Sequence, residues 1–97
     1  MSKVKVYFKK EGIVHRKEND GFSILFNPKV GNTAILDRSA CFIWNQCGHF
    51  VTAEEIVKNI VETFDSVKVK NLDDKVQSLL NDLYDNGFLV YKDKNIA

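Results

Sequence analysis

Proline and glycine are scarce in this sequence, which has one proline and five glycines among 97 residues. This scarcity argues against a disordered or low-complexity chain. No run approaches the ~20 apolar residues that a membrane-spanning helix needs. The opening residues, MSKVKVYFKK, lack the apolar segment of a secretory signal. We therefore expect one cytoplasmic domain with no membrane partner.

Cysteine and histidine are also few, with two residues of each. The nearest approach to a metal or nucleophile site is Cys47, Gly48 and His49, and Cys41 lies six residues before Cys47. Structural zinc usually requires a second matched pair of ligands, which is missing. No Gly-rich phosphate loop and no nucleophile elbow occurs. We expect reduced, partly buried thiols, no cofactor, no metal site and no catalytic residue.

The first third of the chain has the pattern of β-strands. Apolar residues alternate with lysines around Val4–Phe8, which predicts an extra strand or arm. Asp20-Gly21 is a hairpin signal between segments 13–17 and 22–26, so these should pair antiparallel. A second turn, NPKVG, precedes a short strand over residues 32–36.

The remainder has helical periodicity. Asp37 can cap a first helix that ends near Gly48, where we expect a left-handed residue. Thr52 and Glu55 form a capping box for a second helix over residues 52–64. A third helix is expected over residues 71–86, and FLVY after it is a candidate short strand. The sequence predicts an α+β, winged-helix-like fold: a three-stranded antiparallel sheet followed by three helices.

Two helices joined by a tight turn raise the question of DNA binding. A recognition helix normally carries Lys or Arg towards the phosphates. Both candidate helices are net acidic, and residues 37–97 carry seven basic and ten acidic side chains. Residues 1–36 carry seven basic and three acidic side chains, so the positive charge lies on the strands. We expect no nucleic-acid partner, although a winged-helix transcription regulator with a basic arm stays as the alternative.

A peptide-binding module is the hypothesis that these observations favour. A small sheet has an exposed edge whose backbone groups can pair with another strand. The segment NTAIL is short and lacks the charges that usually block such pairing. The N-terminal arm or a second copy of the chain can also cover this edge, so a homodimer stays possible.

The sequence resembles the PqqD family, whose fold is also called the RiPP recognition element. The resemblance lies in Leu36-Asp37, the segment from Ala40 to Trp44, Gly48, the segment from Thr52 to Ile56, and the ending from Leu83 to Leu89. It covers roughly residues 13–91. We therefore divide the chain into an N-terminal strand or arm, residues 1–12, and a PqqD-like winged-helix domain, residues 13–97.

The resemblance implies a non-catalytic peptide chaperone of natural-product biosynthesis, such as PQQ biosynthesis. Such proteins bind the leader of a ribosomally made precursor peptide by strand addition and present it to a modifying enzyme, often a radical SAM protein. The resemblance implies peptide-binding residues on the third strand of the meander and on the third helix. Carried onto this sequence, they are Thr33, Ala34, Ile35, Leu36, Lys75, Val76, Leu79, Asp82 and Leu83.

Two alternatives stay open at this point. A winged-helix regulator would use Lys3, Lys5, Lys9 and Lys10 as a basic arm. A thiol or metal protein would use Cys41, Cys47 and His49.

Overall fold

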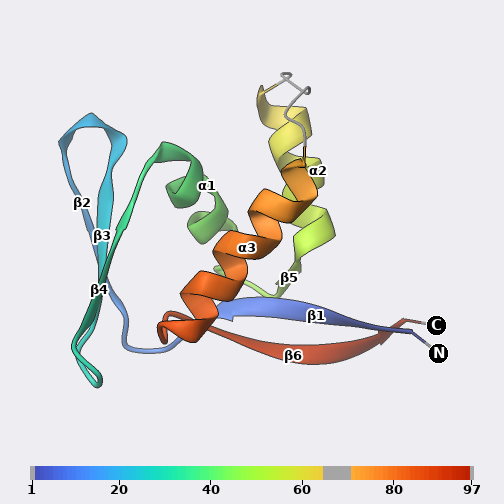
Figure 1. Ribbon diagram of the computed structural model, residues 1–97, viewed down its shortest axis with the longest axis horizontal. Helices are drawn as coiled ribbons and strands as arrows, with labels where there is room; N and C mark the ends of the chain where they lie inside the picture. Colours follow the sequence, from blue (N-terminus) through green and yellow to red (C-terminus); the bar gives the residue numbers. More distant parts are fainter. Residues whose placement is uncertain (1, 65–70, 97) are drawn as a thin grey trace.

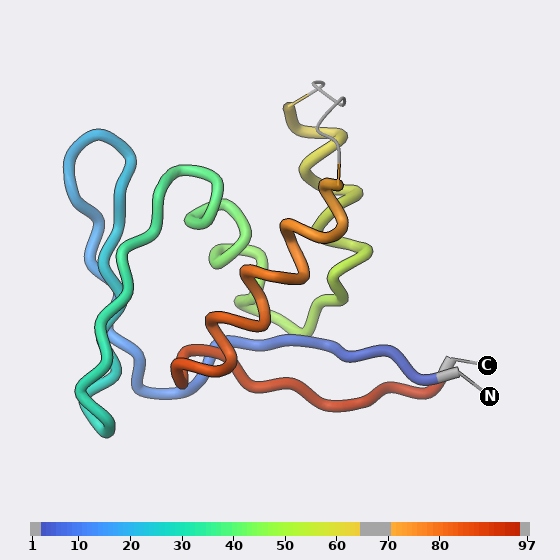
Figure 2. Tube along the Cα trace, viewed as in Figure 1, coloured from blue at the N-terminus to red at the C-terminus, as the bar shows by residue number. Residues whose placement is uncertain are grey.

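The computed structural model describes residues 2–64 and 71–96, which form two antiparallel sheets and three α-helices. In Figure 1 the sheet β2-β3-β4 stands at the left, and the ribbon of β1 and β6 runs along the bottom. The helices lie in the angle between the two sheets, and Figure 2 traces the same path of the chain. The α+β class with three helices is as predicted from the sequence. The elements are β1 (Ser2–Lys9), β2 (Val14–Lys17), β3 (Ser23–Asn27), β4 (Asn32–Leu36), α1 (Arg38–Gln46), β5 (Val51–Thr52), α2 (Ala53–Phe64), α3 (Leu72–Asp85) and β6 (Leu89–Ile96).

The meander of β2, β3 and β4 follows the turn signals in the sequence. The β2–β3 turn contains Asp20 at φ 67° and Gly21 at φ 81°. Glycine adopts this left-handed conformation without steric cost, and aspartate tolerates it better than most residues. Val14 to Lys17 pair with Phe26 to Ser23, so the predicted hairpin is confirmed.

The second sheet has the order β5-β1-β6. Strands β1 and β6 pair along their whole length, from Ser2 opposite Ile96 to Lys9 opposite Leu89. The predicted short strand after α3 is therefore eight residues long. Sequence periodicity missed its second half because KDKN contains no apolar residue with which to show alternation.

Caps fix where two of the helices begin. The Asp37 carboxylate accepts a hydrogen bond from the Ala40 N–H at 2.8 Å before α1. Before α2, Thr52 N–H donates to Glu55 Oε1 at 2.8 Å, and Glu55 N–H donates to Thr52 Oγ1 at 3.0 Å. This reciprocal pair is the predicted capping box. The prediction of a left-handed conformation at Gly48 is wrong, since Gly48 is not among the glycines with positive φ. Helix α1 instead has Cys47 as its C-cap residue, at φ −83°.

We expect Asp37→Ala to lower the free energy of unfolding by about 1 kcal/mol, because the first turn of α1 loses its side-chain acceptor. Urea denaturation of both proteins measures the difference. Ser39→Ala, one residue inside the same helix, is the control and should change stability by less than half as much. Equal effects of the two substitutions would contradict the capping role.

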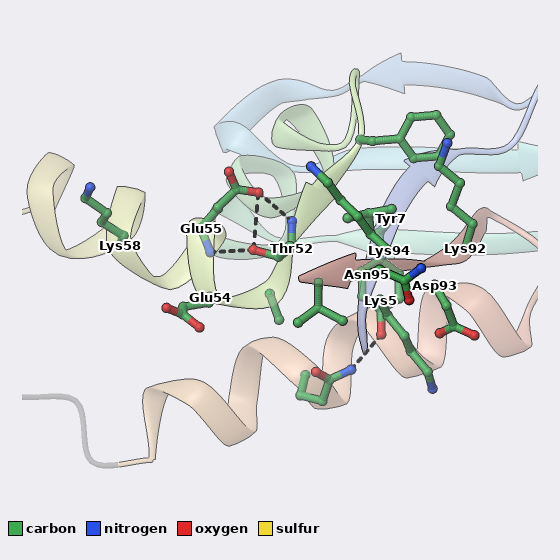
Figure 3. A pocket seen from close by; sticks show the side chains of 15 residues that line it. Lys5, Tyr7, Thr52, Glu54, Glu55, Lys58, Lys92, Asp93, Lys94 and Asn95 are labelled. Atoms are coloured by element: carbon green, nitrogen blue, oxygen red, sulfur yellow. Dashed lines mark hydrogen bonds between the residues drawn. The ribbon is translucent and has the colours of Figure 1, made fainter. Parts of the chain in front are cut away.

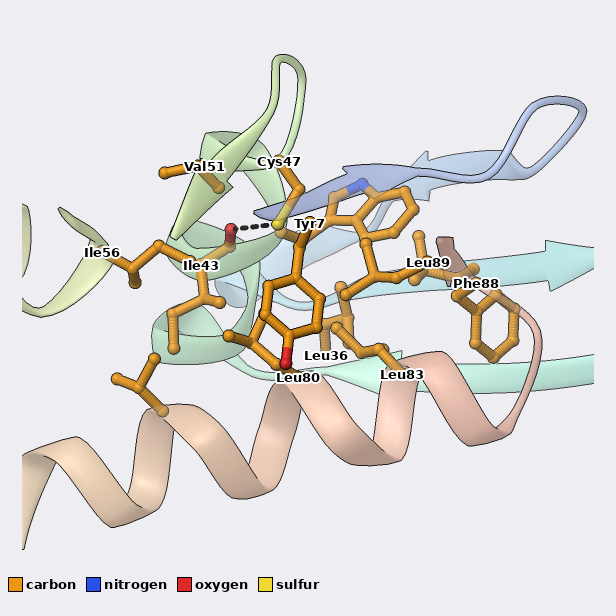
Figure 4. Packing of buried hydrophobic residues seen from close by; sticks show 13 residues of the cluster. Tyr7, Leu36, Ile43, Cys47, Val51, Ile56, Leu80, Leu83, Phe88 and Leu89 are labelled. Carbon is orange, nitrogen blue, oxygen red and sulfur yellow. Dashed lines mark hydrogen bonds between the residues drawn. The ribbon is translucent and has the colours of Figure 1, made fainter. Parts of the chain in front are cut away.

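The core lies where the helices meet both sheets, as Figure 4 shows. Helix α3 contributes Val76, Leu80 and Leu83 to it. Tyr7 of β1 is buried in the same cluster, and its hydroxyl accepts a hydrogen bond from Gln77 Nε2 at 2.8 Å. One buried polar residue, Asn27, joins the meander to the turn after α3, since its Nδ2 donates to the Gly87 carbonyl at 2.7 Å. This single core fixes α3 relative to β4.

A candidate peptide-binding edge

Three of the outer strands differ in the charge that they carry. The β2 edge contains Arg16 and Lys17, and the β6 edge contains the run Lys92, Asp93 and Lys94. Strand β4 has the sequence NTAIL and carries no charged side chain. Charged residues on an edge strand oppose pairing with another chain. The remaining edge strand, β5, is also uncharged but has only two residues, Val51–Thr52. Among the described strands, β4 is therefore the longer uncharged edge for strand addition.

The hydrogen-bond pattern of the meander determines which β4 residues direct their backbone N–H and C=O groups towards the free edge. In an antiparallel ladder, hydrogen-bonded pairs alternate with pairs whose backbone groups point to the opposite sides. Glu18 N–H donates to the Phe22 carbonyl at 2.8 Å, and this pair continues the β2–β3 register. Alternate residues of β3 therefore bond to β2, and the intervening ones direct their N–H and C=O groups towards β4. The residues directed towards β4 are Ser23, Leu25 and Asn27.

The same phase carries over to β4. Ser23, Leu25 and Asn27 lie opposite Leu36, Ala34 and Asn32 in the register. The Gly31 N–H also donates to the Asn27 carbonyl at 2.7 Å, which places that carbonyl on the β4 side. By alternation, Thr33 and Ile35 direct their backbone N–H and C=O groups away from the sheet. These two residues are the ones able to form a ladder with an added strand.

Side chains of β4 alternate between the core and solvent. Leu36 is 2% exposed and Ala34 is half-buried, so these two face the core. Thr33 and Ile35 are exposed on the opposite face, and 72% of the Ile35 surface is accessible. The side chains of an added strand would therefore alternate between two faces of the sheet. One set would lie next to the core-facing residues of β4, and the other set next to its exposed residues.

The C-terminal end of α3 lies next to the start of β4. Lys75, Leu79 and Asp82 share a helical face with Asn86, just past the end of the helix. The Asn86 carbonyl accepts a hydrogen bond from Asn32 Nδ2 of β4 at 2.9 Å. Lys75 and Asp82 are exposed and Leu79 is half-buried. These three side chains are the accessible part of the predicted α3 wall.

The other two predicted wall residues lie in the core. Val76 is 1% exposed and Leu83 is 3% exposed. They support the α3 backbone from beneath and present no surface to a ligand in this conformation. Asn27 of β3 and Asn32 of β4, whose side chains hold these strands against the end of α3, were not assigned to the site from the sequence. An asparagine at the end of a strand is usually interpreted as a turn residue, so no sequence signal separated them.

Basic and acidic side chains lie on different elements of the fold. Strands β1 and β6 carry Lys3, Lys5, Lys9, Lys92 and Lys94 against Asp93. The first turns of α2 and α3 are acidic. A nucleic-acid duplex would be repelled by these helix starts.

One surface hollow in the described part of the chain lies away from β4. It has a volume of about 1150 Å³ and is formed by β1, β5, β6, the start of α2 and Gln77 of α3 (Figure 3). Lysines and carboxylates of both signs line it, and Glu55 there is already engaged in the capping box. The hollow therefore does not coincide with the predicted peptide site.

Cysteine and histidine side chains do not assemble a metal site in the described ranges, where no group of three potential ligands is found. Cys47 is buried, and its Sγ donates to the Ile43 carbonyl at 3.5 Å, whereas His49 is exposed. Cys41 is partly buried next to the Leu36 carbonyl.

Burial lowers the pKa of His15, with a smaller contribution from Lys9 and Lys17, so this imidazole stays neutral at pH 7.

Burial also raises the pKa of the Cys47 thiol to about 12, and the Lys9 ammonium opposes this only in part. In the unfolded chain the thiol ionises near pH 9. Between pH 9 and 12 the unfolded state therefore loses a proton that the folded state keeps, and stability falls as pH rises. We expect this component to have a slope of at most about 1.4 kcal/mol per pH unit.

Denaturation curves at several pH values above 9 measure that slope. Cys47→Ala should remove this component, and Cys41→Ala should leave it in place. The same slope in both variants would contradict the assignment to Cys47.

No helix in residues 2–64 and 71–96 is long and apolar enough to cross a membrane. Together, the two sheets and three helices define a small α+β domain in which β4 is an uncharged edge strand. The family model for PqqD, described as coenzyme PQQ synthesis protein D, matches residues 23–89, which is more than half of the chain. The chain belongs to the PqqD family, as its resemblance to the RiPP recognition element indicated. Searches of curated proteins and of solved structures give no significant match.

Family membership makes the chain a PQQ or RiPP biosynthesis protein of a generally non-catalytic, accessory kind. The matched region begins at β3 and ends at the first residue of β6. It thus includes β4 and the whole of α3, the two elements of the candidate site.

Proposed function

We propose that this protein is a non-catalytic chaperone that binds the leader of a ribosomally made precursor peptide by strand addition to β4. The observation that carries the proposal is the uncharged β4 edge, on which Thr33 and Ile35 direct their backbone groups outward. Two such residues can form up to four hydrogen bonds, each contributing about 1 kcal/mol net. Bonds of that strength need side-chain contacts in addition for specific binding.

The α3 wall supplies those contacts on the core-facing side of the added strand. Leu79 offers an apolar surface, and Lys75 and Asp82 offer one cation and one anion on the same helical face. An acidic leader residue near Lys75 and a basic one near Asp82 would fit this arrangement. Val76 and Leu83 keep the wall in place from the core.

The bound leader is then presented to a modifying enzyme, for which a radical SAM protein is the proposed partner. The protein contributes binding and orientation, and the enzyme contributes the chemistry.

A short uncharged edge can also pair with a second copy of the chain, so peptide titrations should be repeated at several protein concentrations.

An amide NMR titration tests the proposal, with the precursor peptide encoded nearest to this protein's gene as the probe. We expect the largest shifts in residues 32–36 and on the accessible face of α3. Shifts confined to β1, β6 and the hollow beside α2 would place the site elsewhere. A response to duplex DNA that weakens with salt, with none to the peptide, would instead support a DNA-binding protein.

A further inference from the structure

The outer face of the meander, turned away from the core, carries an apolar surface next to β4. Ile35 lies opposite Ile24 in the register, and Thr33 lies opposite Phe26, which in turn faces Val14 of β2. Val14, Phe26 and Ile35 are all exposed large hydrophobic residues. Exposed apolar clusters of this kind mark interaction sites more often than isolated exposed residues do.

The backbone phase links this face to the free edge. Thr33 and Ile35 are the β4 residues with outward N–H and C=O groups, and their side chains are also the ones on the outer face. A peptide residue that pairs directly with Ile35 places its own side chain on the same face, about 5 Å away between Cβ atoms. The neighbouring peptide residues point to the other face, towards Ala34, Leu36 and the α3 wall.

We propose that Ile35 is a specificity contact that selects an apolar leader residue on the outer face of the sheet. This inference rests on the proposed function and adds the chemical class of the bound segment. Recognition uses both faces of the added strand, so the segment contains adjacent apolar residues and not apolar residues at alternate positions only. The residue opposite Ile35 is β-branched or aromatic, because such side chains pack best against an exposed isoleucine in a cross-strand pair.

Binding measurements on two Ile35 variants test this inference with the same precursor peptide. We expect Ile35→Ser to weaken binding about tenfold, since an apolar contact is lost, and Ile35→Val to stay within about twofold. Val30→Ser is the matched control, because Val30 is 62% exposed but lies in the turn before β4. Binding by that control should not change.

A double-mutant cycle locates the partner residue. Each apolar leader residue is replaced by serine in turn and measured against wild type and Ile35→Ser. One leader position should show an effect that Ile35→Ser largely abolishes. The adjacent positions should retain their full effect.

The outcomes separate this inference from the proposed function. If Ile35→Pro abolishes binding but Ile35→Ser binds normally, strand addition stands and the outer-face contact is wrong. If the wild-type protein does not bind the precursor at all, both the proposed function and this inference fail.

Discussion

Ile35→Pro is expected to weaken binding of the precursor peptide severely while leaving the protein folded. The Ile35 N–H points away from β3, so proline at this position removes a donor that only an added strand would use. Proline is tolerated on an edge strand where the N–H faces solvent. We expect a loss of affinity of at least about tenfold, from the missing hydrogen bond and the ring placed against the incoming strand.

Ala34→Pro is the matched comparison, one residue away on the same strand. The Ala34 N–H belongs to the ladder with Leu25, so proline there breaks an internal hydrogen bond. We expect this variant to lower the free energy of unfolding by about 1–3 kcal/mol or more. Isothermal titration calorimetry and urea denaturation of both variants separate binding from stability. Normal peptide affinity in folded Ile35→Pro would contradict strand addition at this edge.

Phe88→Ala is expected to lower the free energy of unfolding by about 3–5 kcal/mol, the range for a fully buried phenylalanine. Phe88 has no exposed surface and lies between the end of α3 and the start of β6. Its N–H donates to the Leu83 carbonyl at 2.8 Å, and its carbonyl accepts from Lys10 N–H at 3.0 Å. Truncation therefore leaves a cavity where the helix and the second sheet meet.

Tyr84→Ala is the control for that substitution, because Tyr84 is an aromatic residue of α3 that is 43% exposed. It should cost less than half as much, since nearly half of its surface already faces solvent. Chemical denaturation at pH 7 measures both. Equal losses of stability in the two variants would contradict the role of Phe88 as a buried contact between α3 and the second sheet.

Local signals in the sequence accounted for the meander and for the starts of α1 and α2. Asp20 and Gly21 formed the expected hairpin turn, and the Thr52–Glu55 pair formed the expected capping box. Each of these features depends on residues within a few positions of one another. The second sheet depends on contacts between opposite ends of the chain, such as Lys9 with Leu89, and local periodicity contains no information on such pairing.

The candidate site was predictable only in outline. Periodicity grouped Val76, Leu79 and Leu83 as one apolar set on the third helix, but a buried residue and a pocket residue give the same pattern. The structure divides them by burial, with Leu79 the accessible one. The sequence also could not determine which β4 amides point outward. That phase depends on how the β2–β3 hairpin closes, as shown by the bond from Glu18 to Phe22.

Amide hydrogen exchange at β4, with and without the precursor peptide, tests strand addition most directly. In the free protein the Thr33 and Ile35 amides should exchange quickly, and the Ala34 amide should be protected by its bond to β3. Peptide binding should protect Thr33 and Ile35 and leave Ala34 nearly unchanged. If the peptide binds and Thr33 and Ile35 still exchange as in the free protein, the leader does not add to β4 as a strand.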